Sequence, residues 1–296
     1  MLYLFCNSIL AWDHVMFIQR NNATVPFSNL MLGSLISRFY KMVSFITNNI
    51  SKYHAKLQYL RHLNCKNHNK LFMEKKPMPI LYVDEASPPA RFVMMTAYLL
   101  NIELDIRKIN LFAGEHKDIS YAKINNLQKV PTLIVDDNAI LDSHAAAIYL
   151  CHQVTSQELY PKDNIFSQAK VNELLFFNSG TLFRLDSEIM SSYFAGKWPV
   201  AKSKIEEWYN ALDYIESKLN ANTWLTCDKM YLCDLCVMQT ISSMLQILPL
   251  LDHHKKIKSW LTEFEKLQCI DINKRGLARL KYYIELYKPT NIIVPT

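Results

Sequence analysis

The chain has 296 residues, half of them hydrophobic and a fifth charged, which suits two modest domains or one large one and is untypical of a disordered protein. Its formal charge of +6 is concentrated in residues 1–72, which hold eight of the 33 basic residues and one of the 27 acids. The remaining 25 bases and 26 acids nearly cancel, so we expect no nucleic-acid partner.

The odd number of cysteines, seven, favours a reducing, cytoplasmic location over a disulfide framework. We expect no membrane partner either, because uninterrupted apolar runs of about 18 residues are lacking.

Residues 1–76 have a composition unlike the rest of the chain. They are rich in Asn, Tyr, Phe, His and Lys, hold few acids and lack sustained helical or strand periodicity. Two interpretations remain open. The composition is typical of translated non-coding sequence, with Met73 as a plausible native start, or the segment is a weak targeting or membrane-surface element. We favour the first and expect residues 1–76 to be an N-terminal extension outside the fold.

The first clear element is a strand around Leu81 and Val83, followed by a turn and a helix that opens on two prolines. Ser87 stands at the start of that helix, where a hydroxyl is a good N-cap. The same place offers unsatisfied N–H groups and the positive end of a helix dipole, which stabilise an anion. From this stretch alone, helix capping is the simpler role for Ser87.

Strand and helix patterns continue to about residue 155. Asp142 and Ser143 precede the last helix of this region and are suited to cap it. The expected elements are a strand over 104–111, a short helical stretch to Asn125, a strand over 130–135, a hairpin partner at 139–141 and a helix over 145–151. The order β-α-β-α-β-β-α predicts an α/β thioredoxin-like domain over residues 77–155.

Helical periodicity dominates from Tyr160 onward and predicts an all-α domain over residues 160–288. Its helices are expected over 168–194, 201–219, 232–248 and 254–267. Cys233 and Cys236 have the spacing of a metal-binding pair but fall within a helical pattern, without a second pair or a nearby histidine cluster. We interpret them as buried thiols and predict no metal site.

Four motifs in the first domain carry a specific resemblance. They are S-P-P-x-R from Ser87, N-L-x-x-G-E-H ending at His116, V-P-T-L from Val130 and D-S-H-A from Asp142. At these spacings the chain resembles a glutathione transferase of the insect delta and epsilon type. The resemblance covers residues 77–285 and implies the cytosolic glutathione transferase fold, glutathione as the bound cosubstrate and a homodimer.

The resemblance also implies roles for particular residues. Ser87 would donate a hydrogen bond to the glutathione sulfur and favour the thiolate, which is the nucleophile. The Val130 main chain, before a cis Pro131, would pair with the cysteinyl part of glutathione. Asp142 and Ser143 would hold the γ-glutamyl amine and carboxylate. The remaining predicted glutathione contacts are His116, Gln128, Lys129 and His144.

Two of these positions depart from the common pattern of the family. Gln128 stands where many relatives have histidine and can still donate a hydrogen bond to the glycyl end of glutathione. His144 replaces a common arginine, as it does in many epsilon-type members. Ser87 and Ala90 occupy the two positions of a C-x-x-C pair, so thiol–disulfide exchange through a protein cysteine is disfavoured.

Asp186, in the second domain, has apolar neighbours three and four residues away: Leu182, Phe183, Ile189 and Met190. An unpaired carboxylate there is costly, so an ion pair with Arg184 or a lysine, or a solvated helix edge, is the simplest explanation. However, L-F-R-x-D-S-x-x-M in this helix, with N-L-F-x-G-E and L-x-D-S-H-A, resembles the Noppera-bo subfamily of epsilon-type transferases. That resemblance implies that ionised Asp186 accepts a hydrogen bond from a steroid hydroxyl and that the protein serves ecdysteroid biosynthesis.

We therefore expect a glutathione transferase with a serine-stabilised thiolate and an acceptor pocket lined by Phe112, Phe183, Asp186, Ile189 and Met190. Two alternatives remain: a general detoxification transferase, or a non-catalytic glutathione- or steroid-binding protein on the same fold. An unpaired Asp186 facing an open pocket distinguishes the steroid interpretation from the first alternative. A measurement of glutathione-conjugating turnover distinguishes an enzyme from the second alternative, a non-catalytic binding protein.

Overall fold

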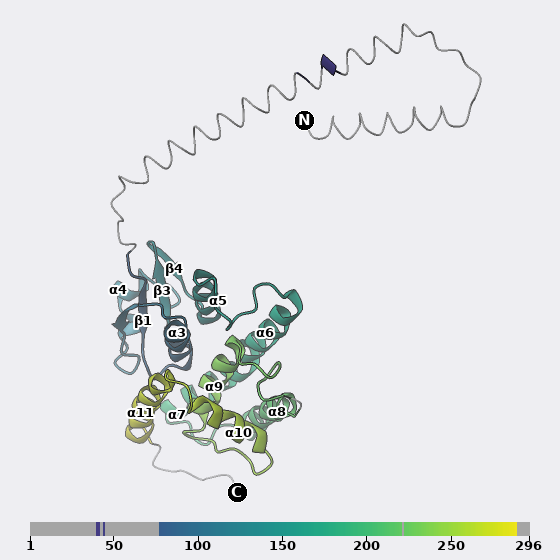
Figure 1. The fold of residues 1–296 in the computed structure, drawn as a ribbon. Helices are drawn as coiled ribbons and strands as arrows, with labels where there is room; N and C mark the ends of the chain where they lie inside the picture. Colours follow the sequence, from purple (N-terminus) through teal and green to yellow (C-terminus); the bar gives the residue numbers. More distant parts are fainter. Residues whose placement is uncertain (1–39, 42–43, 45–76, 221, 289–296) are drawn as a thin grey trace, which may run out of the picture. The chain divides into compact units, whose positions relative to one another are not determined.

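The computed structural model describes residues 40–41, 44, 77–220 and 222–288 (Figure 1). The chain divides into two units, Met1–Lys76 and Pro77–Thr296, and the elements below belong to the second. The expected N-terminal extension, residues 1–76, lies almost wholly outside the described residues, and its role stays a prediction.

A four-stranded mixed sheet forms the first part of the second unit. Its strands are β1 Ile80–Val83, β2 Asp105–Lys108, β3 Thr132–Val135 and β4 Asn138–Ile140, in the spatial order β2-β1-β3-β4. β1 runs parallel to β2 and antiparallel to β3, and β4 returns antiparallel to β3. Leu81 lies opposite Leu133 and both are fully buried, so the two central strands supply apolar side chains to the core.

The helices between these strands complete the thioredoxin-like order. α3 (Pro88–Leu99) joins β1 to β2, while η1 (Glu115–Lys117) and α4 (Ile119–Ala122) lie between β2 and β3. α5 (Ser143–Gln153) follows β4. The β3–β4 hairpin turns at Asp136 and Asp137, both with positive φ, as the turn sequence predicts. The predicted order β-α-β-α-β-β-α is confirmed.

The second half of this unit is helical, as predicted, with two differences. α6 (Ile165–Phe177) and α7 (Phe183–Phe194) are separated by a π-helical segment, η2 (Asn178–Leu182), where the sequence predicts one continuous helix. A further helix, α11 (Ile270–Leu286), lies beyond the last predicted one. The other helices are α8 (Lys202–Lys218), α9 (Leu232–Met244) and α10 (Lys255–Phe264).

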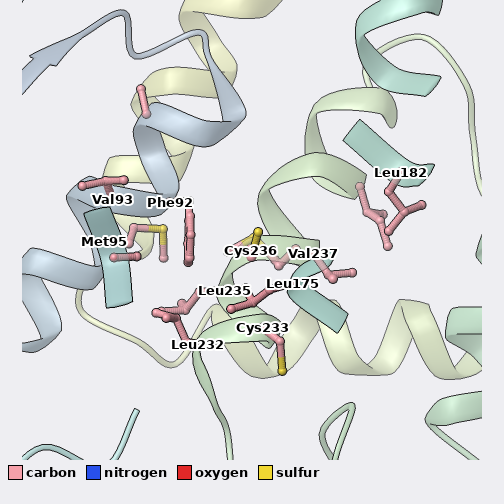
Figure 2. Close-up of a cluster of buried hydrophobic side chains, with 14 of the residues drawn as sticks. Phe92, Val93, Met95, Leu175, Leu182, Leu232, Cys233, Leu235, Cys236 and Val237 are labelled. Carbon is pink, nitrogen blue, oxygen red and sulfur yellow. The ribbon is translucent and has the colours of Figure 1, made fainter. Parts of the chain in front are cut away.

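α9 is the centre of the helical half, because each of its residues is buried. It packs against α3, α6, α7 and α11, so one core joins the sheet-bearing half to the helical half. Figure 2 shows Phe92, Val93 and Met95 of α3 in one cluster with buried side chains of α9. Cys233 and Cys236 belong to that cluster as free, buried thiols. Within the described part of the chain, no helix is both long and apolar enough to cross a membrane.

Candidate active site

Ser87 occupies the turn between β1 and α3, at the N-cap position of α3, with φ −75° and ψ 121°. Its backbone N–H donates to the Asp84 carbonyl oxygen (2.9 Å), which closes the turn. The Ser87 hydroxyl makes no capping hydrogen bond to α3, and the side chain lies in the wall of a cavity. Capping is therefore not its role in the structure, and the hydroxyl is available at the positive end of a helix dipole.

The turn that carries Ser87 is held by Arg91, which is fully buried on α3. Its guanidinium donates to the carbonyl oxygens of Glu85 (2.9 Å) and Ala86 (2.8 Å), directly before Ser87. Burial lowers the pKa of Arg91 to about 10, so the group remains charged at neutral pH. Its other acceptors are the side chains of Gln239 and Ser243 and the Gln239 carbonyl oxygen (3.4 Å) on α9, and the side chain of Asn273 on α11.

The start of α5 carries Asp142 and Ser143. Asp142 Oδ1 accepts from the backbone N–H groups of His144 and Ala145, each at 2.9 Å, so Asp142 caps α5 as predicted. The pKa of Asp142 is lowered to about 2, first by its side-chain hydrogen bond with His144. Asp142 is exposed, whereas Ser143 is buried. This helix start therefore offers an anionic acceptor for an ammonium group and a favourable place for a carboxylate.

The His144 ring is directed inward, toward α9. Its side chain is 13% exposed, with Nδ1 3.5 Å from Asp142 Oδ1 and Nε2 3.2 Å from Cys236 Sγ. Burial alone would lower the pKa of His144, but Cys236 and Asp142 raise it above its ordinary value. The resemblance implies a contact between His144 and glutathione. The structure places the ring between Asp142 and Cys236, where it can orient Asp142.

The loop before β3 holds the predicted main-chain contact. The Val130–Pro131 peptide bond is cis, as the resemblance implies, and Val130 is buried. Lys129 is exposed, but its carbonyl oxygen accepts from Tyr121 Oη (2.7 Å) and Asn125 Nδ2 (2.9 Å). These two bonds fix the backbone of the loop while leaving the Lys129 ammonium in solvent.

His116 and Gln128, the predicted partners of the glycyl end of glutathione, are both half-buried. His116 lies in η1, and its Nδ1 is buried without a hydrogen-bond partner among the described residues. Burial and the neighbouring Lys117 lower the pKa of His116, so the ring is neutral at pH 7 and can donate one hydrogen bond. Gln128 has a positive φ of 54°, which is uncommon for a residue other than glycine.

A cavity of about 490 Å³ lies beside Ser87, lined by the turn after β1, the loop after β2, and parts of α7, α9 and α11. Four of the predicted acceptor residues line it: Phe112, Phe183, Asp186 and Met190. Ile189 does not, because it is fully buried and borders a separate hollow near Pro199 and Val200. Further wall residues, which the sequence analysis did not single out, are Phe194, Ser243 and Leu280.

Asp186 is 3% exposed and lies on the face of α7 that lines the cavity. Its Oδ1 is buried without a hydrogen-bond partner among the described residues. Burial raises the pKa of Asp186 to about 7, against the attraction of the Arg91 charge. Both protonation states are therefore populated near neutral pH, which corrects the expectation of a fully ionised carboxylate.

The explanation of Asp186 as the ion-pair partner of Arg184 is wrong. Arg184 is exposed and pairs with Glu188 (2.8 Å) and Glu207 (3.1 Å). The positive charge that acts on Asp186 is that of Arg91, which has hydrogen-bond partners of its own. Asp186 thus combines an unpaired carboxylate oxygen with a place on a wall that also contains aromatic and aliphatic side chains.

Three side chains outside this cavity, Asp213, His253 and His254, lie close enough together to hold a cation. Asp213 Oδ1 is 2.7 Å from His253 Nε2 and 2.9 Å from His254 Nε2. His254 Nδ1 accepts the backbone N–H of Leu251 (3.2 Å), so its ring proton lies on Nε2 and is donated to Asp213. The contacts of Asp213 with the two histidines are therefore hydrogen bonds that join α8 to the start of α10.

The sequence and the fold have counterparts among known proteins. Residues 81–157 match the family described as glutathione S-transferase, N-terminal domain. Glutathione S-transferase 1 of Manduca sexta is 32% identical over 203 residues, which cover 67% of this chain and 91% of that protein. An epsilon-class glutathione S-transferase from the housefly, Musca domestica, is 27% identical, with a TM-score of 0.68 over 72% of this chain and 100% of that one. A glutathione transferase homologue from Drosophila mojavensis, solved with bound glutathione, is 30% identical, with a TM-score of 0.67 over 71% of this chain and 97% of that one.

Proposed function

Because this chain belongs to the glutathione S-transferase family and is a glutathione transferase, we propose that its nucleophile is the glutathione thiolate, stabilised by the Ser87 hydroxyl. A hydrogen-bond donor and a helix dipole both favour thiolate over thiol. The observation that carries the proposal is a hydroxyl at a helix start that makes no capping bond and borders a cavity.

In the proposed reaction, glutathione releases its thiol proton to solvent, and the Ser87 O–H donates to the resulting sulfur anion. The sulfur attacks an electrophilic carbon of the acceptor, so a C–S bond forms, and the electrons of the broken bond depart with the leaving group. Ser87 keeps its proton throughout. It therefore acts by stabilising charge rather than as a base.

The rest of glutathione is assigned to the residues of the thioredoxin-like domain, 77–155. The Val130 main chain pairs with the cysteinyl unit, and exposed, anionic Asp142 holds the γ-glutamyl amine with Ser143 at the carboxylate. The inward ring of His144 supports a role in orienting Asp142 rather than a contact with glutathione. The glycyl carboxylate is assigned to His116, Gln128 and Lys129.

For the acceptor, we propose a molecule of the steroid class, used in ecdysteroid biosynthesis as in the Noppera-bo subfamily that the Asp186 helix resembles. The acceptor then lies against the helical domain, 160–288. Two observations support this. Phe112, Met190 and Leu280 give the cavity an apolar wall, and Asp186, which also lines it, has a carboxylate oxygen without a hydrogen-bond partner among the described residues. A ligand hydroxyl can donate to ionised Asp186, and a ligand ketone can accept from the protonated form.

We also propose that the enzyme works in the cytoplasm as a homodimer, without a nucleic-acid or membrane partner. The odd number of cysteines supports a reducing compartment. The near-neutral balance of charge after residue 72 supports the absence of a nucleic-acid partner. The dimer rests on the resemblance to the family.

Steroid affinity tests the acceptor proposal. We expect Asp186→Ala to weaken binding of a hydroxysteroid about ten- to hundredfold above pH 7, because a charge-assisted hydrogen bond is lost. Asp186→Asn keeps the shape but removes the charge, and Ser187→Ala, on the same cavity wall, is the matched control. Turnover of a chloro-dinitrobenzene electrophile, which has no hydroxyl, should change little. Wild-type steroid affinity in both Asp186 variants would favour a general detoxification transferase instead.

A further inference from the structure

Asp84 is a buried carboxylate that the proposed reaction does not use. Its side chain has a relative exposure of 0%. Oδ1 accepts the backbone N–H of Ala86 (2.9 Å), which precedes Ser87, and Oδ2 accepts that of Leu111 (3.0 Å), which precedes Phe112. One carboxylate thus joins the turn that carries Ser87 to the loop that carries Phe112, and both of those residues line the cavity.

The charge of Asp84 is matched by Arg279 of α11. Arg279 Nε donates to Asp84 Oδ1 (2.7 Å), and Nη2 donates to Oδ2 (3.0 Å). Nη2 also donates to Asn110 Oδ1 (3.2 Å), which accepts the backbone N–H of Phe112 (3.1 Å). Burial alone would raise the pKa of Asp84, but the hydrogen bonds from Arg279 and the two backbone N–H groups hold it below its ordinary value. Asp84 is therefore ionised at neutral pH, and the pair is charged on both sides.

α11 contacts the same loop again one turn later. Tyr283 stacks on Phe112, with ring centroids 3.6 Å apart and ring planes 10° from parallel. The Arg279 guanidinium carbon lies 5.2 Å from the Tyr283 ring centroid, which links the ion pair to the aromatic stack. Leu280, next to Arg279, lines the cavity. The helix thus fixes the loop while it presents an apolar side chain to the acceptor.

We propose that Asp84 and Arg279 are positioning residues that set the separation between the Ser87 hydroxyl and the Phe112 wall of the cavity. This inference rests on the proposed role of Ser87. Asp84 and Arg279 act through the backbones of Ala86 and Leu111, since neither of their side chains lines the cavity. Two parallel charge-assisted bonds are directional, and small displacements of reacting groups cost more in rate than in ground-state binding.

Arg279→Lys and Arg279→Gln, made in the full chain, test the proposal. Lysine keeps the charge but cannot bridge both carboxylate oxygens, whereas glutamine removes the charge. We expect kcat with a chloro-dinitrobenzene electrophile to fall about tenfold in Arg279→Lys and about a hundredfold in Arg279→Gln, with KM for glutathione within about threefold of wild type. The ultraviolet absorbance of bound thiolate should report a higher thiol pKa, because Ser87 is displaced.

Arg275→Gln is the matched control. Arg275 is exposed and lies four residues before Arg279 on α11. Its Nε is 3.9 Å from Oε2 of Glu85, in the turn that carries Ser87. Circular dichroism and thermal melting establish that each variant is folded. Asp84→Asn removes the other charge of the pair and keeps the shape of the side chain. The double variant Asp84→Asn with Arg279→Gln should lower kcat no more than the worse of the two single variants does.

Folded Arg279 variants with the kcat and thiol pKa of Arg275→Gln would overturn the positioning role. The role of Ser87 has a separate readout. If Ser87→Ala leaves the thiol pKa unchanged, the proposed function fails at its first step, whatever the Arg279 variants do. If Ser87→Ala raises the thiol pKa while the Arg279 variants do not, the positioning proposal fails alone.

Discussion

Gly276 of α11 lies so close to Arg91 of α3 that a methyl group on Gly276 would overlap the Arg91 side chain and the Glu85 carbonyl oxygen. We expect Gly276→Ala to lower the free energy of unfolding by about 1–3 kcal/mol, because the overlap falls on the Cδ methylene of the buried Arg91 side chain and on backbone. Gly180→Ala is the control, since a methyl group there meets nothing within 4 Å. Denaturant titration of the two variants decides the matter, and equal stability would contradict the close contact.

Ser87→Ala removes the proposed donor to the glutathione sulfur and leaves in place the groups proposed to hold the peptide part of glutathione. We expect kcat for conjugation to fall about a hundredfold, as for loss of an oxyanion-type donor, with a smaller change in KM for glutathione. Ser191→Ala, another serine on the cavity wall, should keep wild-type kinetics. Wild-type kcat in Ser87→Ala at neutral pH would remove the catalytic role of the hydroxyl.

Asp186 makes stability depend on pH in a definite direction. Its pKa in the folded protein, about 7, lies above the ordinary value of 3.8, so between these values the unfolded chain binds fewer protons than the folded one. The free energy of unfolding should therefore fall as pH rises through this window, by about 1.4 kcal/mol per pH unit for this group. Asparagine at position 186 does not titrate, so the free energy of unfolding of Asp186→Asn should rise relative to that of wild type as pH rises. Parallel pH profiles of stability for the two proteins would contradict the raised pKa.

His144→Ala should weaken glutathione binding indirectly, through Asp142. The hydrogen bond with His144 is the first cause of the low pKa of Asp142, so without it that pKa should move up from about 2 toward its ordinary value. We expect KM for glutathione to rise about two- to tenfold with kcat little changed, and the acid limit of glutathione binding to shift to higher pH. Calorimetric titration with glutathione across the acid range measures both effects. His152→Ala, on the exposed side of α5, is the control.

The sheet, the hairpin and the turn at Ser87 follow from short-range patterns, which is why the sequence predicts them. α11 escapes prediction for a physical reason. Its buried positions have helical spacing, but two of the five are not apolar, so the stripe is interrupted: Ile270, Asn273, Gly276, Leu280 and Ile284. The polar and small residues stand there because Arg91 occupies the space opposite them.

The cavity wall shows a second limit of prediction from sequence. Its six α7 members follow steps of three and four residues along one face: Phe183, Asp186, Ser187, Met190, Ser191 and Phe194. Ile189 lies off that face, although it is three residues from Asp186, and spacing from Asp186 alone does not reveal this. Asp84 and Arg279 are 195 residues apart, so local patterns carry no signal for their pairing.

Arg91 bonds at once to the turn before α3, to α9 and to α11. If the helical half separated from the sheet, the buried Arg91 charge would lose several hydrogen-bond acceptors at once. A partly separated state would therefore leave both the guanidinium and its acceptors without hydrogen-bond partners, which is costly. The two halves are thereby made cooperative, and loosening of either one is transmitted to the turn that carries Ser87. Substitutions deep in α9 or α11 can thus impair catalysis without touching glutathione or the acceptor.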